Sequence, residues 1–86
     1  MDGYEVITDY TEANKYTFPS DGYLEIQATS SASDNAVRSV LQGANETTGV
    51  ILYALNDYET IFVRKGMKYY TLSKLGNASV LFVPFS

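Results

Sequence analysis

The chain has 86 residues, a formal net charge of −4 and a pI near 4.5. Its six Lys and Arg residues are scattered apart from the pair Arg64-Lys65, so the clustered basic face that nucleic acids require is missing. The absence of cysteine and histidine excludes disulfides, thiolate nucleophiles and imidazole ligands. No apolar stretch approaches the roughly 18 residues of a membrane span. We therefore expect neither a nucleic-acid nor a membrane partner.

This length predicts a single domain, residues 1–86. A domain of this size buries only about 60–65% of its unfolded surface, so its small core gains from a partner subunit. The opening residues Met1-Asp2-Gly3 lack the basic start and the apolar run of a secretory signal. We expect no signal peptide.

Short runs rich in Val, Ile, Thr, Tyr and Phe are separated by turn-forming residues, and this pattern predicts strands. In chain order we expect them at Tyr4–Thr8, Lys15–Phe18, Gly22–Ala28, Ala36–Gln42, Val50–Leu55, Tyr58–Arg64, Met67–Ser73 and Ala78–Phe85. About eight short strands at this spacing predict an all-β fold, an antiparallel, jelly-roll-like β-sandwich. One alternative stays open, because Val37, Val40 and Leu41 also fit a helix over residues 36–43.

The turn Pro19-Ser20-Asp21-Gly22 separates the second and third predicted strands. Pro19 cannot donate to a ladder, so the second strand must end there. Asp21 can bond back to the backbone, and Gly22 tolerates left-handed geometry. The turn therefore sets the register of the third strand, which places Leu24, Ile26 and Ala28 on one face.

Several later strands are apolar on both faces, whereas a lone sandwich needs only one apolar face for each sheet. In the last strand Val80 and Phe82 point one way, and Leu81, Val83 and Phe85 point the other way. The second face can be covered by another subunit, by a folded-over loop, or it can be an open ligand site. We favour a subunit interface, formed by Phe62, Leu81, Val83 and Phe85.

Enzyme chemistry has little support in this sequence. Without histidine or cysteine, no Ser/His/Asp or Cys/His arrangement can exist. Glu25 and Glu59 are the least implausible carboxylate pair, and solvated surface charge explains them better. The loops Asp34-Asn35 and Asn56–Glu59 offer oxygen ligands but lack an alternating calcium pattern. We expect no catalytic residue, no metal and no cofactor.

Tyrosine is the remaining candidate for recognition, because it combines a stacking face with a hydroxyl at low entropic cost. Eight tyrosines are present, of which Tyr10 and Tyr70 are among those that we expect to point outward. Tyr23, Tyr53 and Tyr58 are the possible ligand contacts. The competing interpretation is that these rings simply fill half-buried strand positions.

The order of the turns also carries a resemblance to the small β-sandwich modules of tailed-bacteriophage tail fibres, head fibres and capsid decoration proteins. The matching positions are Tyr16, Thr17, Pro19, Asp21, Gly22, Tyr23 and Leu24, then Val63, Lys65 and Gly66, then Phe82, Pro84 and Phe85. The resemblance implies a homotrimer located in the virion, assembled in the host cytoplasm, with other virion proteins as partners.

Two functions are therefore expected from the sequence. The first is a non-enzymatic structural module of a phage virion that self-associates as a trimer. The alternative is a carbohydrate- or receptor-binding adhesion module that meets a host surface glycan. It would use surface tyrosines and the polar loops Thr29–Asn35 and Gly43–Gly49.

Overall fold

The computed structural model describes residues 3–29 and 33–85 of the chain, so Met1 and Asp2 of the signal-peptide prediction and part of the loop Thr29–Asn35 lie outside it. Strands and turns make up the fold. The strands are β1 (Glu5–Val6), β2 (Tyr16–Thr17), β3 (Gly22–Gln27), β4 (Ala36–Gln42), β5 (Gly49–Leu55), β6 (Tyr58–Val63), β7 (Lys68–Leu75) and β8 (Ser79–Pro84). Within the described ranges, no helix is long and apolar enough to span a bilayer.

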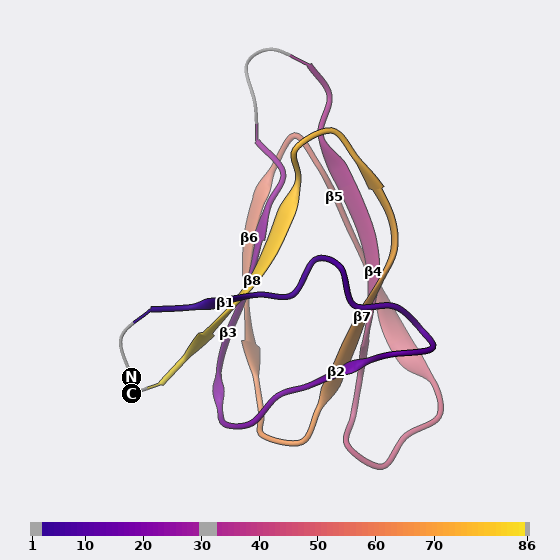
Figure 1. Ribbon diagram of the computed structural model, residues 1–86, viewed down its shortest axis with the longest axis vertical. Helices are drawn as coiled ribbons and strands as arrows, with labels where there is room; N and C mark the ends of the chain where they lie inside the picture. The colour runs from indigo at the N-terminus through magenta and orange to yellow at the C-terminus, as the bar shows by residue number, and fades with distance from the viewer. Residues whose placement is uncertain (1–2, 30–32, 86) are drawn as a thin grey trace.

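The strands form two four-stranded antiparallel sheets that face each other (Figure 1). The first sheet has the order β1-β8-β3-β6, and the second has the order β2-β7-β4-β5. Most strands that follow one another in the chain lie in different sheets, and this strand order is that of a jelly-roll, a sandwich of two sheets. The expected all-β antiparallel sandwich is confirmed. The helical alternative for residues 36–43 is wrong, because β4 pairs with both β5 and β7 along its whole length.

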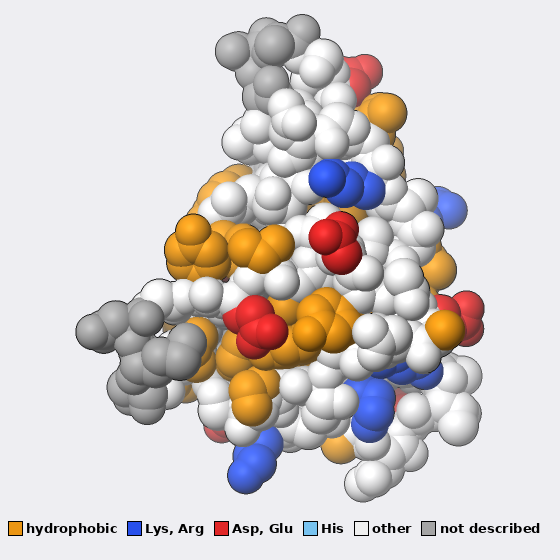
Figure 2. Space-filling view, viewed as in Figure 1, with side chains coloured by type: hydrophobic (Ala, Val, Ile, Leu, Met, Phe, Trp, Pro, Cys, Tyr) orange, Lys and Arg blue, Asp and Glu red, His pale blue; other side chains and the backbone are white. Residues whose placement is uncertain are grey.

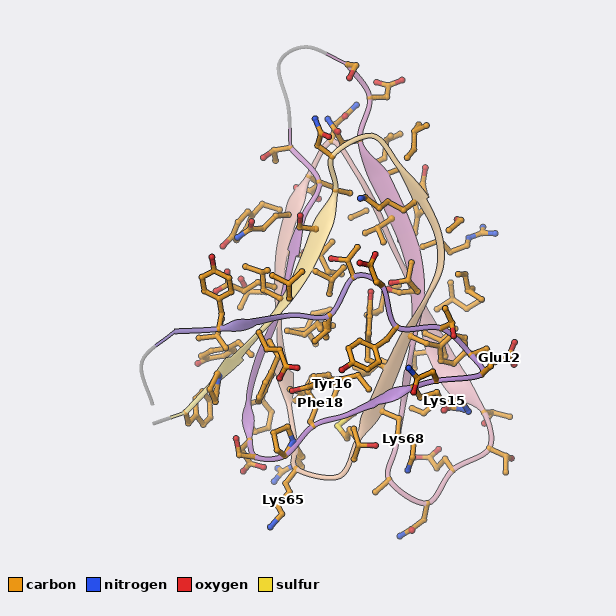
Figure 3. The ribbon with its side chains drawn as sticks, in the orientation of Figure 1. Glu12, Lys15, Tyr16, Phe18, Lys65 and Lys68 are labelled. Carbon is orange, nitrogen blue, oxygen red and sulfur yellow. The ribbon has the colours of Figure 1, made fainter. Side chains whose placement is uncertain are left out.

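The core lies between the two sheets and is rich in aromatic rings. Tyr16 and Phe18, on and just after β2, point into this space (Figure 3). The ring centroids of Tyr16 and Phe18 are 5.2 Å apart, and Phe82 of β8 lies 5.1 Å from Phe18. Leu24 and Ile26 of β3 point inward beside them and are buried, as the alternation of that strand predicts. Edge-to-face contacts of this kind fix the ring positions as well as burying area.

The segment between β1 and β2 closes one side of the sandwich. It crosses in front of both sheets in Figure 1. The Ile7 amide donates to the Val80 carbonyl of the first sheet, and the Thr71 amide of the second sheet donates to the Tyr10 carbonyl. On the opposite side, β5 and β6 are joined by the tight turn Asn56-Asp57. Asn56 has a positive φ of 52°.

The Pro19–Gly22 turn works differently from the sequence expectation. Gly22 does not adopt a positive φ. Instead, a Cβ atom at Gly22 would lie 2.4 Å from the Val83 carbonyl oxygen, so the glycine permits close approach of β8. The Asp21 side chain bonds outside its own turn. Its Oδ1 accepts a 2.8 Å hydrogen bond from the amide of Lys65, which ties this turn to the turn between β6 and β7.

Candidate functional site

The outward side of the first sheet carries a cluster of exposed aromatic rings. The register places Tyr23 of β3 between Phe62 of β6 and Val83 of β8, and Phe85 follows β8. The Phe85 centroid is 4.9 Å from Tyr23 and 5.8 Å from Phe62. Tyr23, Phe62 and Phe85 are exposed to 42%, 45% and 43%. We call Tyr23, Phe62, Val83 and Phe85, with Leu81 beside them, the aromatic face.

The four residues predicted to form a subunit interface all lie on the aromatic face. They come from two strands that are not neighbours, because β3 separates β6 from β8. Leu81 differs from the others, since only 8% of it is exposed and it is already buried within the chain. Val6 and Glu25 flank it across the sheet. Phe62 and Phe85 therefore carry most of the apolar surface that is left to cover.

Charged and polar groups border the rings. The Arg64 guanidinium carbon lies 5.3 Å from the Phe62 ring centroid, at cation–π distance. Farther along the sheet, Glu25 lies two residues from Tyr23 on β3 and Tyr58 lies four residues from Phe62 on β6. The Tyr58 hydroxyl donates a 2.7 Å hydrogen bond to Oε1 of Glu25. This bond raises the pKa of Tyr58. Gln27 donates to the same oxygen at 3.5 Å. The sheet surface therefore has an apolar end and a polar end.

The sequence did not single out Arg64 or the bond between Glu25 and Tyr58, because neither follows from the pattern of one strand. Both depend on which strands are neighbours.

Figure 2 shows hydrophobic side chains gathered on the side of the molecule where β1, β3 and β8 lie. Tyr4 and Val6, which precede and end β1, are also exposed apolar residues. Because Val6 opposes Leu81, the apolar surface extends toward β1.

The predicted ligand tyrosines do not form one site. Tyr23 and Tyr58 lie on the first sheet, whereas Tyr53 lies on β5 of the second sheet, opposite Arg38. The expectation that the Tyr70 side chain points outward into solvent is wrong, since only 7% of Tyr70 is exposed. The Lys15 ammonium lies 5.4 Å from its ring centroid. Tyr10 is half-buried and packs edge-on against the core ring of Tyr16.

The carboxylates do not converge. Glu25 opposes Thr60, whereas Glu59 opposes Ile26, so the two glutamates point to opposite faces of the first sheet. In residues 3–29 and 33–85, no group of three or more acidic side chains is placed to hold a metal ion.

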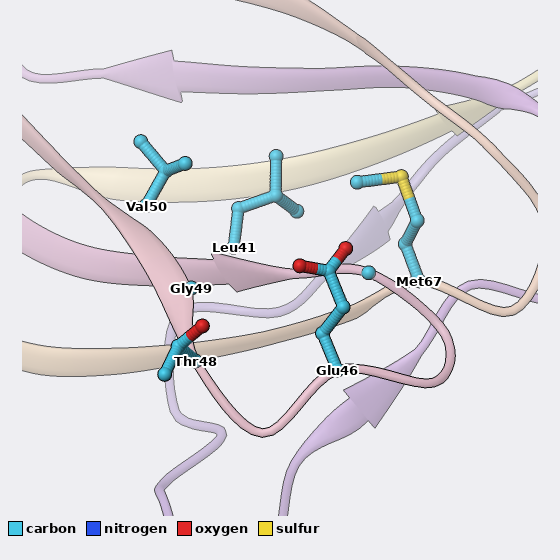
Figure 4. Close-up of a pocket in the computed structure, with 7 residues that line it drawn as sticks. Leu41, Glu46, Thr48, Gly49, Val50 and Met67 are labelled. Atoms are coloured by element: carbon cyan, nitrogen blue, oxygen red, sulfur yellow. The ribbon is translucent and has the colours of Figure 1, made fainter.

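A shallow pocket of about 270 Å³ lies between the loop that joins β4 to β5 and the start of β7 (Figure 4). Its walls are Leu41, Val50 and Met67, and the Glu46 carboxylate stands at the rim. Gly43, Thr48 and Gly49 complete the lining, so most of it comes from the loop Gly43–Gly49 that the adhesion alternative names. The pocket offers one acidic group above an apolar floor.

Comparison with known proteins returns no relative of this chain: no protein-family model, no curated protein and no solved structure matches it.

Proposed function

We propose that this chain is a non-enzymatic structural module that self-associates as a trimer through the aromatic face. The expected setting is a phage virion, as a fibre head or a capsid decoration protein, with other virion proteins as partners. The single observation that carries the self-association is the ring cluster of Tyr23, Phe62 and Phe85, each close to half exposed on one sheet surface. The jelly-roll architecture supports the setting only as an analogy, since capsid and lectin domains both use it.

The make-up of the aromatic face favours a protein partner. Aromatic residues and arginine are enriched in the centres of protein interfaces, and Arg64 beside Phe62 gives that combination. The Phe62 ring already contacts Arg64 and Phe85, so less of it is free to stack on a sugar than in a lone exposed ring. Covering the exposed part of each ring in a subunit contact contributes about 1 kcal/mol.

Light scattering after size exclusion, at two protein concentrations, tests this proposal. We expect at least the mass of a trimer for the natural chain and a lower mass for Phe62→Lys, because a charge in the ring cluster would be buried unpaired. Leu72→Lys is the matched control, since Leu72 is as exposed as Phe62 but lies on β7 of the other sheet. A monomer at both concentrations, or dissociation by the control as well, would contradict the proposal.

Glycan binding is the second candidate, and the polar end of the same sheet favours it. The Glu25 carboxylate, the Gln27 amide and the Tyr58 hydroxyl lie together next to the exposed rings. These polar groups can form hydrogen bonds with a sugar while an aromatic ring packs against the apolar side of the sugar. Binding on a glycan array that is lost in Tyr58→Phe, with no change in the mass of the protein, would select this function over the first.

A further inference from the structure

The two sheets present four edges to their surroundings, and the edges are unequally protected. β1 and β2 are edge strands of two residues each. β6 is longer, but its Glu59 opposes the core residue Ile26, so a carboxylate sits on the inward side of an edge strand. Short strands and inward-pointing charges are both known devices that stop an edge from pairing with another chain.

The remaining edge, β5, has none of these devices. It runs for seven residues, Gly49–Leu55, with the sequence GVILYAL, which contains no charge and no proline. In the described ranges, β4 is the strand that pairs with it. Val50, Ile51, Tyr53 and Leu55 are exposed to 64%, 59%, 59% and 46%. A long, apolar and open edge is a ready template for a further strand.

Alternation along β5 separates its two faces. Leu52 and Ala54 pack toward the core, which explains their burial in a lone domain. Ile51, Tyr53 and Leu55 point outward, where the chain itself supplies no cover. Burial of the core therefore does not explain why the outward positions of this strand are apolar.

We propose that β5 pairs antiparallel with β5 of a second copy of this chain, across a two-fold axis. The pairing joins two four-stranded sheets into one continuous sheet. Pairing centred on Leu52 or on Tyr53 sets outward residues opposite outward residues, so the apolar surface of both copies is continuous. Because β5 carries no charge, no like charges meet across the axis.

A second copy is the occupant that best fits this strand. A two-fold pairing uses the same edge on both chains, so each β5 edge is closed by one partner strand. The contact shares no residue with the aromatic face and lies on the other sheet. One seven-residue strand from each copy makes a small contact, so the association should be weak and should depend on concentration.

Sedimentation velocity over a concentration series tests the edge contact in the Phe62→Lys background, where the aromatic face is disabled. We expect a reversible dimer, and adding Tyr53→Lys should weaken its association constant about tenfold or more. Leu75→Lys is the matched control, because Leu75 is as exposed as Tyr53 and lies on the same sheet, but two strands from the edge. It should leave the dimer intact.

The outcomes separate this contact from the proposed trimer. If the aromatic face does not associate, the natural chain itself should be a dimer that Tyr53→Lys converts to a monomer. A Phe62→Lys chain that is monomeric at every concentration overturns the edge proposal. Equal weakening by Leu75→Lys also overturns it, because the contact would then use the sheet face. Hydrogen exchange gives a readout without further substitution, since half of the β5 amides should slow as the concentration rises.

Discussion

The Tyr16 hydroxyl donates a 2.9 Å hydrogen bond to Oε1 of Glu5, and this bond joins the two sheets of the sandwich. Tyr16 belongs to β2 of the second sheet, and Glu5 belongs to β1 of the first. The bond therefore links the two shortest strands of the fold, each of which has little ladder pairing of its own. Burial, the hydrogen bond to Glu5 and its negative charge all raise the pKa of Tyr16 well above its usual range.

Removing this hydroxyl should lower stability in a pH-dependent way. Tyr16→Phe keeps the ring in the core but loses the bond, so we expect a loss of about 1 kcal/mol in the free energy of unfolding at neutral pH. Because the folded pKa of Tyr16 is raised, its contribution is complete below pH 10, where the unfolded phenol is still protonated, and is lost as the pH rises further. Urea unfolding at neutral pH and above pH 10 measures both effects. The alkaline loss should be smaller in Tyr16→Phe than in the natural chain, and an equal loss in both would contradict this assignment.

Gly22 should resist replacement by alanine because β8 lies against it. A Cβ atom there would meet the Val83 carbonyl oxygen at 2.4 Å and the Pro84 Cα at 2.9 Å, and backbone cannot move aside cheaply. We expect Gly22→Ala to lower the free energy of unfolding by about 1–3 kcal/mol. Gly43→Ala is the matched control, because its nearest neighbour is the flexible end of Glu46. Thermal unfolding of both variants decides the point, and similar melting temperatures would refute the close-approach role of Gly22.

Asn56 should stabilise the fold in two ways, through its left-handed backbone conformation and through the hydrogen bonds of its side chain to Asn35 and Asp34. It has a φ of 52°, its Oδ1 accepts from the Asn35 amide at 3.0 Å, and its Nδ2 donates to Asp34 at 2.9 Å. Asn56→Ala loses all of these, and we expect it to cost about 2 kcal/mol. Asn56→Gly loses the bonds but keeps the conformation, so it should be about 1 kcal/mol more stable than Asn56→Ala. Denaturant unfolding of the pair tests this, and equal stabilities would exclude a conformational contribution.

Local patterns predicted much of the fold because they act within one strand or one turn. Alternation placed Leu24, Ile26 and Ala28 inside, and all three are buried. Gly66, in the turn between β6 and β7, has a φ of 91°, a conformation that glycine adopts readily. The predicted bounds of β1 and β2 were too long, because each strand pairs over only two residues with a longer partner, β8 or β7, and the extent of that pairing is a tertiary property.

The features that the sequence did not predict are those that depend on which strands are neighbours in the sheets. Tyr70 was expected outside because its own strand cannot show that Lys15, far away in the chain, lies over its ring. The contact of Phe62 with Phe85 follows from the antiparallel pairing of β3 with both β6 and β8, and no periodicity reports that pairing. The open edge of β5 is likewise visible only once β4 is known to be its neighbour. For the candidate site, the sequence supplied the residues of the face, and the structure supplied their arrangement.

Asp21 provides a final test. The sequence predicts that its side chain bonds within its own turn, whereas in the structure it accepts a hydrogen bond from Lys65, far away in the chain. Its Oδ1 accepts from the Lys65 amide at 2.8 Å, and its carbonyl accepts from the Phe85 amide at 3.0 Å. Asp21→Ala removes only the side-chain bond, and since this bond is exposed we expect a loss of about 0.5–1.5 kcal/mol. Asp21→Asn keeps a side-chain oxygen at the same position and should retain most of that stability. If the bond acted only within the Pro19–Gly22 turn, the Lys65 amide would exchange equally fast in the natural chain and in Asp21→Ala. We expect faster exchange at Lys65 in Asp21→Ala alone, measured by NMR.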